Sequence, residues 1–473
     1  MRYLILIILT AISLSAKGKP LSFNQARELL YSNNLEIQAA REAVEIAKLE
    51  LQATRGLRLP NIDFTGGYIL MQRDIDIDFN GIKNSLDKVT QSILSESINN
   101  GVINQILSQL INLGLSPLMA ADWSYTLQNR STFIGGVSIV QPIYMGGRIN
   151  AAIEASEAKL HQAEQLLRSI EYEKLNELVE RYYGVVIARM ALEYRTKAAE
   201  NINRHLEEAL ELEREGIIAH SEVLYVQYKL SVAKREVEQT NSELMVAQSA
   251  LQELLNYSDE IYAEDRIFIV NTIQPIEYYK ENAINLNPIL QLSKESIAIS
   301  EAGVKFMRAD LLPEISALGS STIFSKNLSN IIPRWSIGVG VQFKLFDGLA
   351  KERRYIASKK SLSVATSIVK NTEQEIMLLI DKEYYSAINS LQSIATINSS
   401  IEFAEAYLHT KREGFKEGMT TSIEVIDAEL ALEGAMLERV NEAYNFCKSL
   451  SHLLEASGLS DHFDEYRNMG III

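Results

Sequence analysis

Two acidic residues three positions apart, Glu424 and Asp427, stand out in the stretch EGMTTSIEVIDAE. On a helix this spacing places both carboxylates on one face. An earlier stretch, EGIIAHSEVLYVQ, repeats the first acid as Glu222 but has Tyr225 in the place of Asp427. An acid in a first helical turn complements the helix macrodipole, which accounts for the shared glutamate. It does not account for Asp427, because aspartate is a weak helix former beyond the cap.

Each acidic stretch follows a glycine at which a helix is expected to end. Gly216 and Gly418 occupy equivalent positions, and glycine readily adopts the left-handed conformation that terminates a helix. Hydroxyl side chains after each glycine, at Ser221 and at 420–422, can cap the helix that follows. The pattern predicts that a long helix reverses direction at each glycine.

The two corners belong to a tandem repeat that covers most of the chain. Residues 33–63 match 286–316 at an offset of 253, and the corners match at an offset of 202. The difference of 51 residues (253 − 202) predicts an insertion in the first copy, at about 71–121. The predicted organisation is a signal peptide at 1–16, a first repeat at 17–270 that includes the insertion, a second repeat at 271–460 and a C-terminal tail at 461–473.

The first residues have the pattern of a secretory signal peptide. Arg2 precedes an apolar run from Tyr3 to about Leu14, with cleavage expected near Ala16. The run is shorter than the roughly 20 residues that span a bilayer as a helix. An exported chain can still enter a membrane through β-strands.

Composition excludes several classes of function. The formal charge is −15, and no cluster of Lys and Arg is present, so a nucleic-acid partner is not expected. One cysteine, Cys447, cannot form an intramolecular disulfide, and the six histidines lack the spacing of metal ligands. No phosphate-binding or nucleophile motif is present. The sequence therefore predicts no metal, no cofactor and no enzymatic activity.

Each copy of the repeat is predicted to contain a helix, a Leu-Pro break, two strands, a very long helix, the glycine corner and a further helix. Pro60 and Pro313 end the first helix because proline lacks a backbone N–H and disfavours helix in the preceding residue. Residues 150–214 contain no proline, and as one helix they would extend about 97 Å at about 1.5 Å per residue. Tyrosine pairs at 182–183 and 384–385 recur in both copies and are expected in the core.

The stretch from Trp335 to Leu345 alternates large apolar residues with small or polar ones. A period of two is typical of a β-strand with one apolar face. That face can pack on a protein core, or it can face lipid. Four predicted strands cannot close a barrel alone, so several chains would have to share one if the face meets lipid, because open sheet edges are not tolerated there.

The signal peptide, the tandem halves, the Leu-Pro breaks, YMGGR (144–148), FDG (346–348) and EGMTTSIEVIDAE together resemble TolC-type outer-membrane efflux proteins. The resemblance covers nearly the whole mature chain and depends on the order and double occurrence of these motifs. It implies a mainly α protein with a transmembrane β-barrel. In this fold a homotrimer forms a 12-stranded β-barrel from four strands per chain, and a 12-helix α-barrel continues it through the periplasm.

The resemblance also implies roles for the two corners. They become the periplasmic tip, where the helices close the pore, and Gly216 and Gly418 mark the turns at which an adaptor docks. Glu424 and Asp427 match the family's acidic positions and would form two stacked rings that make selectivity electrostatic. Thr420 stands where some members carry a gating arginine, so the same latch of salt bridges is not expected. The predicted constriction and gate comprise Glu424, Asp427, Thr420, Glu222 and Tyr225.

The function that the resemblance implies is a passive exit duct of a tripartite efflux or type I secretion system, embedded in outer-membrane lipid. Its partners would be two further copies of the chain, a periplasmic adaptor (membrane fusion protein) and an inner-membrane transporter of the RND, ABC or MFS type. The alternative is a secreted periplasmic coiled-coil rod, structural or adhesin-like, with the strands in a small sandwich. The rod hypothesis gives no account of the one-sided apolar strand at 335–345.

Overall fold

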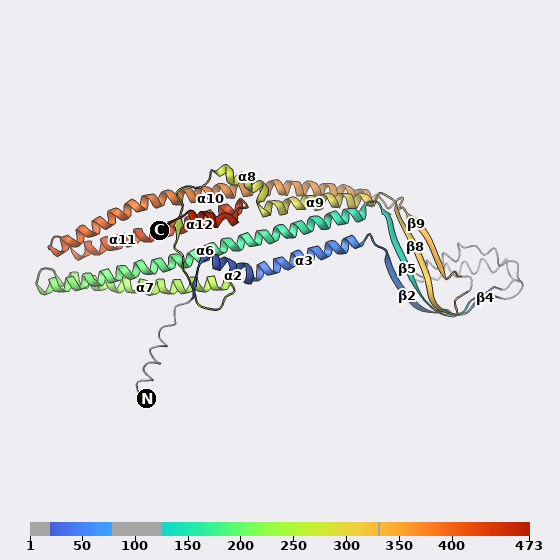
Figure 1. Cartoon of the computed structure of the whole chain (residues 1–473), viewed down its shortest axis with the longest axis horizontal. Helices are drawn as coiled ribbons and strands as arrows, with labels where there is room; N and C mark the ends of the chain where they lie inside the picture. The colour runs from blue at the N-terminus through green and yellow to red at the C-terminus, as the bar shows by residue number, and fades with distance from the viewer. Residues whose placement is uncertain (1–18, 78–124, 330–331) are drawn as a thin grey trace, which may run out of the picture. The chain divides into compact units, whose positions relative to one another are not determined.

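The computed structural model describes residues 19–77, 125–329 and 332–473, and the chain divides into two compact units (Figure 1). The helical unit contains Glu154–Glu301, Lys359–Ile473 and the chain up to Leu51. The strand-containing unit contains Gln52–Ile153 and Ala302–Ser358. Each unit therefore draws on both copies of the sequence repeat.

The longest helices form two hairpins of equal dimensions. α6 (Arg148–Arg214) and α10 (Ala350–Lys416) are unbroken helices of 67 residues. They are followed by α7 (His220–Leu254) and α11 (Ser422–Ala456), of 35 residues each. The second hairpin begins 202 positions after the first (350 − 148), which is the offset of the sequence repeat. The predicted repeat, the very long helices and their reversals are confirmed.

Glycine ends the long helix at both corners. The φ angles of Gly216 and Gly418 are 75° and 69°, in the left-handed region that only glycine adopts without strain. In each turn a backbone N–H just after the glycine returns to a carbonyl of the last helical turn, from Ile217 to Leu212 and from Met419 to Gly414. These bonds satisfy carbonyl groups that the helix end would otherwise leave without partners.

The helix after the turn begins differently in the two copies. Thr421 is the N-cap of α11 and forms a capping box with Glu424, as the hydroxyl pattern predicts. The N-cap of α7 is Ala219, whose side chain makes no capping bond. The prediction that Ser221 caps this helix is wrong, because α7 begins at His220 and Ser221 already lies inside it.

Two shorter helices precede each long one and join at an asparagine. α2 (Phe23–Asn33) meets α3 (Leu35–Gly56) at Asn34, and α8 (Ile276–Leu286) meets α9 (Pro288–Ala309) at Asn287. The side-chain amide of Asn34 donates to the carbonyl of Leu254 at 3.1 Å, while its oxygen accepts from backbone N–H groups at the start of α3. Each buried asparagine thus satisfies backbone groups at two helix ends, since Asn287 bonds in the same way to Ala456 and Leu290.

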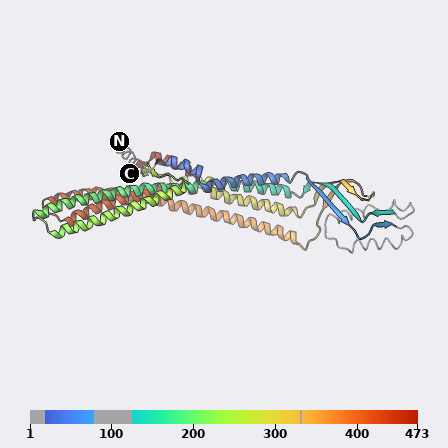
Figure 2. The ribbon, with the colours of Figure 1, turned by 90° about the horizontal axis from the view of Figure 1, so that it is seen from below.

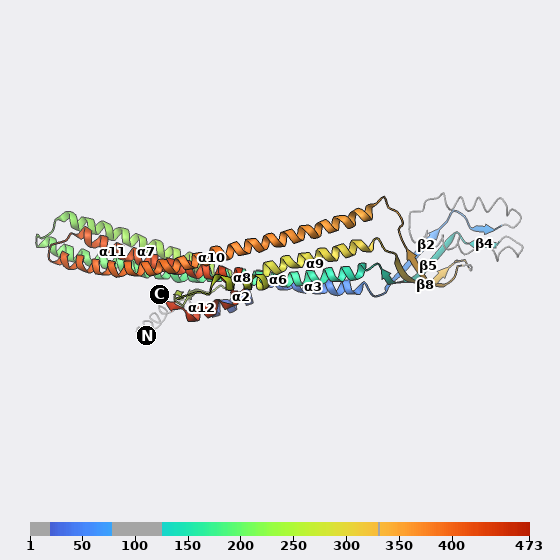
Figure 3. The same ribbon diagram turned by 90° about the horizontal axis from the view of Figure 1, so that it is seen from above.

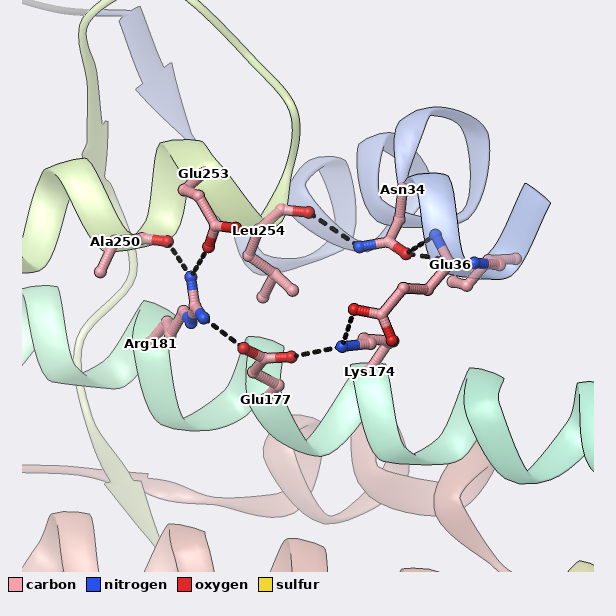
Figure 4. Close-up of polar contacts among 9 residues, drawn as sticks. Asn34, Glu36, Lys174, Glu177, Arg181, Ala250, Glu253 and Leu254 are labelled. Atoms are coloured by element: carbon pink, nitrogen blue, oxygen red, sulfur yellow. Dashed lines mark hydrogen bonds and ion pairs between the residues drawn. The ribbon is translucent and has the colours of Figure 1, made fainter. Parts of the chain in front are cut away.

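A series of ion pairs runs beside Asn34 and ties α3, α6 and α7 together (Figure 4). Lys174 of α6 contacts Glu36 of α3 at 2.7 Å and Glu177 at 3.1 Å. Arg181 contacts Glu177 and reaches across to Glu253 of α7. The side chain of Lys174 is only 10% exposed, so its two carboxylate partners offset the cost of burying its charge.

The centre of the helical unit is aromatic. Tyr182 and Tyr183 are fully buried and pack against Phe23, with ring centroids 5.4 and 5.8 Å apart. Tyr384 packs against this core from α10, but Tyr385 is 63% exposed. The core prediction is therefore wrong for Tyr385, because the two copies give their matching tyrosines different neighbours.

Short strands and a terminal helix close the helical unit. β1 (Lys19–Leu21) pairs in parallel with β6 (Ile261–Ala263), and β7 (Phe268–Ile269) pairs antiparallel with β10 (Ile471–Ile472). Between α11 and β10 lie a 3-10 turn, η3 (Ser460–His462), and α12 (Phe463–Met469). The predicted C-terminal tail is thus folded back onto the helical unit.

The main sheet of the strand-containing unit is antiparallel and has four strands, in the order β2-β5-β8-β9 (Figure 1). The four strands are β2 (Asn61–Leu70), β5 (Ser131–Met145), β8 (Glu314–Lys326) and β9 (Trp335–Gln342). Among the described strands none closes this sheet, so β2 and β9 are its edges. β9 ends at Gln342, three residues before the alternating pattern predicts.

The predicted apolar face of β9 is exposed. Trp335 is 68% exposed, Ile337 81% and Val341 67%. In the register of the sheet, Ile337 lies beside Gly319 of β8, and Gly319 lies beside Ile139 of β5. The sandwich that the rod hypothesis requires would cover this face with a second sheet, so its expectation is not met.

Two predicted segments lie outside the described residues. These are the predicted signal peptide and the part of the predicted insertion from residue 78 onward. Its described beginning contains β3 (Ile75–Ile77), which pairs with β4 (Tyr125–Gln128). Across the parts of the chain that the structure describes, no helix has both the length and the apolarity to cross a membrane.

Candidate functional site at the tip of the helical hairpins

The two glycine turns lie at the same end of the helical unit, where both hairpins reverse (Figures 2 and 3). A direct bond joins them: Oε2 of Glu222 accepts a hydrogen bond of 2.9 Å from the backbone N–H of Ser422. Glu222 therefore bonds to the first residue of α11, a position where its negative charge also complements the helix macrodipole. We call this pair of joined turns, 215–222 and 417–427, the tip.

An apolar cluster beneath the turns packs the hairpins together. Phe415 is 1% exposed, and its ring lies 4.4 Å from that of His205, which is itself buried. Burial, followed by the charge of Arg412, lowers the pKa of His205 to about 4, so this imidazole is neutral at ordinary pH. The cluster comprises Ile202, Ala209, Val223, Val226, Leu230, Ala233, Phe415, Val425 and Ile426.

Glu424, the first of the two stacked acids, is bonded on both carboxylate oxygens. Oε1 accepts from the ammonium of Lys411 at 2.6 Å, and Oε2 accepts from the backbone N–H of Thr421 at 2.9 Å. The hydrogen bond from Lys411, and then that from Thr421, lower the pKa of this carboxyl group. The Lys411 ammonium also lies 5.3 Å from the centre of the Tyr407 ring.

Asp427 differs from Glu424 in its surroundings. Its side chain is exposed, whereas its neighbours Ile426 and Ala428 are buried. Among the contacts of the described residues, no hydrogen bond or ion pair engages its carboxylate. The structure therefore separates the two acids that the sequence pairs: one is neutralised within the chain, and the other is free to meet ions or a further copy.

The remaining predicted gate residues have structural contacts. The hydroxyl of Thr420 donates to the carbonyl of Lys411 at 2.8 Å, and its methyl group lies over Gly414, where a Cβ would approach to 2.9 Å. Tyr225 is half-buried against the apolar cluster, and the ammonium of Lys229 lies 5.5 Å from its ring centre. Thr420 therefore fixes the conformation of the turn.

Sequence reasoning missed a second polar link between the hairpins. Glu429 of α11 is buried and accepts from Arg412 of α10 at 2.5 Å and from Asn201 of α6. One helical turn further on, the side chain of Glu433 is 10% exposed and its carboxylate lies 4.0 Å from the guanidinium of Arg195. Only the proximity of these acids on α11 signals such a cluster, since their partners come from distant segments.

Burial, followed by the charge of Glu236, raises the pKa of Glu433 to about 7. This carboxyl group therefore changes charge near neutral pH. In the ranges that the structure describes, no group of three or more His, Cys, Asp and Glu residues is placed to hold a metal ion.

The whole architecture matches solved outer-membrane channels. The Campylobacter jejuni CmeC outer membrane channel has a TM-score of 0.69 at 14% identity, covering 95% of this chain and 91% of CmeC. The outer membrane protein VceC of Vibrio cholerae has a TM-score of 0.69 at 13% identity, covering 92% and 96%. The fold class of this chain is thus that of outer-membrane channels with an α-barrel and a β-barrel.

The chain belongs to the outer membrane efflux protein family, whose model it matches over residues 26–257 and 280–459. Outer membrane protein TolC of Vibrio cholerae is 22% identical over 342 residues, which are 68% of this chain and 76% of TolC. The alkaline protease secretion protein AprF of Pseudomonas aeruginosa is 21% identical over 352 residues, or 70% and 71%. Protein CyaE of Bordetella pertussis is 24% identical over 258 residues, so the match spans about half the length of CyaE (54%).

Family membership confirms the predicted resemblance and the predicted location. The chain is an outer-membrane exit duct for efflux or type I secretion, with its helical part in the periplasm. The family consists of channel proteins.

Proposed function

We propose that three copies of this chain form a passive duct whose periplasmic opening is gated at the tip. The observation that carries this proposal is the four-stranded sheet, whose two edge strands pair with no further described strand and whose apolar face is exposed. In hydrocarbon an unpaired backbone N–H or C=O costs several kcal/mol, so the edges at β2 and β9 must pair with other chains. Three sheets of four strands supply the 12-stranded barrel that the family resemblance implies.

The helices also carry apolar surface that a single copy leaves uncovered. On α10 alone, Leu378 is 69% exposed, Tyr385 63% and Phe403 71%. Exposed apolar patches of this kind mark contact surfaces. The proposed occupant is the neighbouring copy of the same chain, whose helices would complete an α-barrel around the duct.

The proposed gate is built from the predicted tip residues. Asp427 supplies the free carboxylate of the constriction, Glu222 joins the two turns in the closed arrangement, and Thr420 fixes the conformation of its own turn. Tyr225 packs behind the constriction against the apolar cluster. Opening then requires the α10–α11 hairpin to move away from the α6–α7 hairpin, which breaks the bond between Glu222 and Ser422.

A periplasmic adaptor would dock on the turns at Gly216 and Gly418 and stabilise the open arrangement. An inner-membrane transporter of the RND, ABC or MFS type would supply the energy, because the duct itself performs no chemistry. The relatives support both uses of such a duct, since one is named a secretion protein and others are outer-membrane channels.

Planar-bilayer recording of the purified protein tests this proposal. Discrete channels with a preference for cations are expected, and Asp427→Asn should lower that preference and weaken block by divalent cations. Asp259→Asn, an equivalent charge change in the exposed loop after α7, is the matched control and should leave selectivity unchanged. A protein that forms no channels would contradict the proposed duct, and channels unaffected by Asp427→Asn would remove the constriction from the tip.

A further inference from the structure

Lys411 lies in α10 shortly before the helix ends at the Gly418 corner, and its side chain contacts Glu424, one of the two predicted constriction acids. The ammonium is 2.6 Å from Oε1 of Glu424, and its side chain is 19% exposed. The ring of Tyr407, one helical turn earlier on α10, lies 5.3 Å from the ammonium. An aromatic face attracts a cation at this distance, so the ring and the carboxylate hold the ammonium between them.

The bonding of Glu424 leaves little of its charge available to other ions. Its carboxylate accepts from the Lys411 ammonium, from the backbone N–H of Thr421 at 2.9 Å and from the Thr421 hydroxyl at 3.3 Å. The ion pair with Lys411 has no net charge. Asp427, three positions further along α11, has no such partner among the described residues.

The internal repeat provides a comparison within the same chain. Glu222 is the counterpart of Glu424 in the first copy, and the position that matches Lys411 (411 − 202 = 209) is Ala209, which is buried and uncharged. Glu222 instead bonds to the backbone of the other hairpin. A lysine at this point is therefore not needed to build a hairpin of this kind, since the first hairpin forms the same turn without one.

We propose that Lys411 sets the ion selectivity of the constriction by neutralising Glu424, so that Asp427 alone provides its free negative charge. The inference rests on the proposed function, because it assigns a role within the tip constriction. Each copy then contributes one free carboxylate instead of two. The negative electrostatic field that multivalent cations meet at the constriction is therefore weaker than two free acids in each copy would produce.

Removing the lysine charge should release the second acid. Lys411→Met retains the length and much of the packing against Tyr407 but cannot pair with Glu424. One additional unit charge at about 6 Å in water is worth a factor of about threefold in cation binding, and several copies facing one pore raise it further. The cation-to-anion permeability ratio should therefore rise at least about threefold, and block by La³⁺ should occur at a correspondingly lower concentration.

The experiment measures reversal potentials in a KCl gradient, together with La³⁺ block, for a small set of variants. Lys411→Arg retains the charge and should restore the wild-type ratio. The double variant Lys411→Met with Glu424→Gln removes both charges and should return the ratio toward the wild-type value. Lys382→Met breaks another lysine pair on α10, with Glu383 at 2.9 Å, and should have no effect.

Asp427→Asn, recorded in parallel, separates the failure of this inference from the failure of the proposed function. If Asp427→Asn lowers selectivity while Lys411→Met leaves it unchanged, the role of Lys411 is refuted and the tip constriction stands. If neither variant alters selectivity, the constriction lies elsewhere and both proposals fall. A rise in Lys411→Met that persists in the double variant would also refute the inference, because the released charge would not be that of Glu424. The trimer of each variant is checked by its mass in detergent before recording.

Discussion

Replacing Glu222 with alanine should loosen the tip and favour the open channel. The bond of 2.9 Å from the Ser422 N–H to Glu222 directly joins the two turns, and the acceptor is a carboxylate. Hydrogen bonds to charged groups contribute about 1.5–3 kcal/mol, and partial exposure of Glu222 places this one at about 1.5 kcal/mol. If the bond exists only in the closed arrangement, its loss shifts the equilibrium about tenfold for each copy.

Single-channel recording measures this shift as the ratio of open to closed time. Glu222→Ala should raise the ratio by about an order of magnitude for each copy that opens independently. Glu222→Gln, which retains an acceptor oxygen without the charge, should lie between alanine and wild type. Glu215→Ala, in the same turn but with an exposed side chain, removes an equal charge and serves as the control. An unchanged ratio in Glu222→Ala, or an equal rise in Glu215→Ala, would refute the reasoning.

Three further predictions concern stability and membrane insertion. Because burial raises the pKa of Glu433 to about 7 from 4.5, its carboxylate destabilises the folded protein above pH 7, and the free energy of unfolding should rise by about 2 kcal/mol as the pH falls from 8 to 5. Thermal unfolding at several pH values should show that Glu433→Gln loses most of this pH dependence. A pH dependence that is the same in Glu433→Gln and in the wild type would mean that other groups cause it. Asn34→Ala removes a helix cap and leaves the Leu254 carbonyl without its side-chain partner, so it should lower the free energy of unfolding by about 2–3 kcal/mol. A loss below about 0.5 kcal/mol would contradict the role of Asn34 in joining α2 to α3. Ile337→Lys places a charge on the exposed apolar face of β9 and should reduce the fraction of protein in the outer membrane, whereas Ser336→Lys on the opposite face should not. Equal insertion of both variants would contradict a lipid-facing role for Ile337.

Local signals in the sequence were sufficient to predict the long helices, their reversals and the strand β9. The glycines at 216 and 418, the Leu-Pro breaks and the absence of proline between them predict the helices and their reversals, because helix ends depend on nearby residues. The period of two in β9 likewise predicts its strand and its apolar face. The offset of 202 then carries each assignment from one copy to the other.

Contacts between distant segments could not be predicted in this way. Glu222 and Ser422 are 200 positions apart, and Lys411 meets Glu424 only because the chain reverses between them. The sequence therefore pairs Glu424 with Asp427 as two equivalent acids, while the fold gives only the first of them a cation. The repeat also misleads where the copies differ, as the buried Tyr183 and its exposed counterpart Tyr385 demonstrate.

The predicted cap at Ser221 fails for a related reason. The turn after Gly216 lacks the side-chain cap that the turn after Gly418 has, because α7 starts at His220 and its N-cap residue is an alanine. The bond that Glu222 would make in a capping box goes instead to the N–H of Ser422. A residue that is expected to serve its own helix thus serves the neighbouring hairpin.

The mass of the protein extracted from the outer membrane in detergent, after subtraction of the bound detergent, tests the central claim most directly. The edges of β2 and β9, which no other described strand pairs with, and the exposed apolar residues of β9 and α10 predict a particle of three chains. A monodisperse monomer or dimer that retains the helical content of the native protein would contradict it, because four strands per chain would then leave the barrel open.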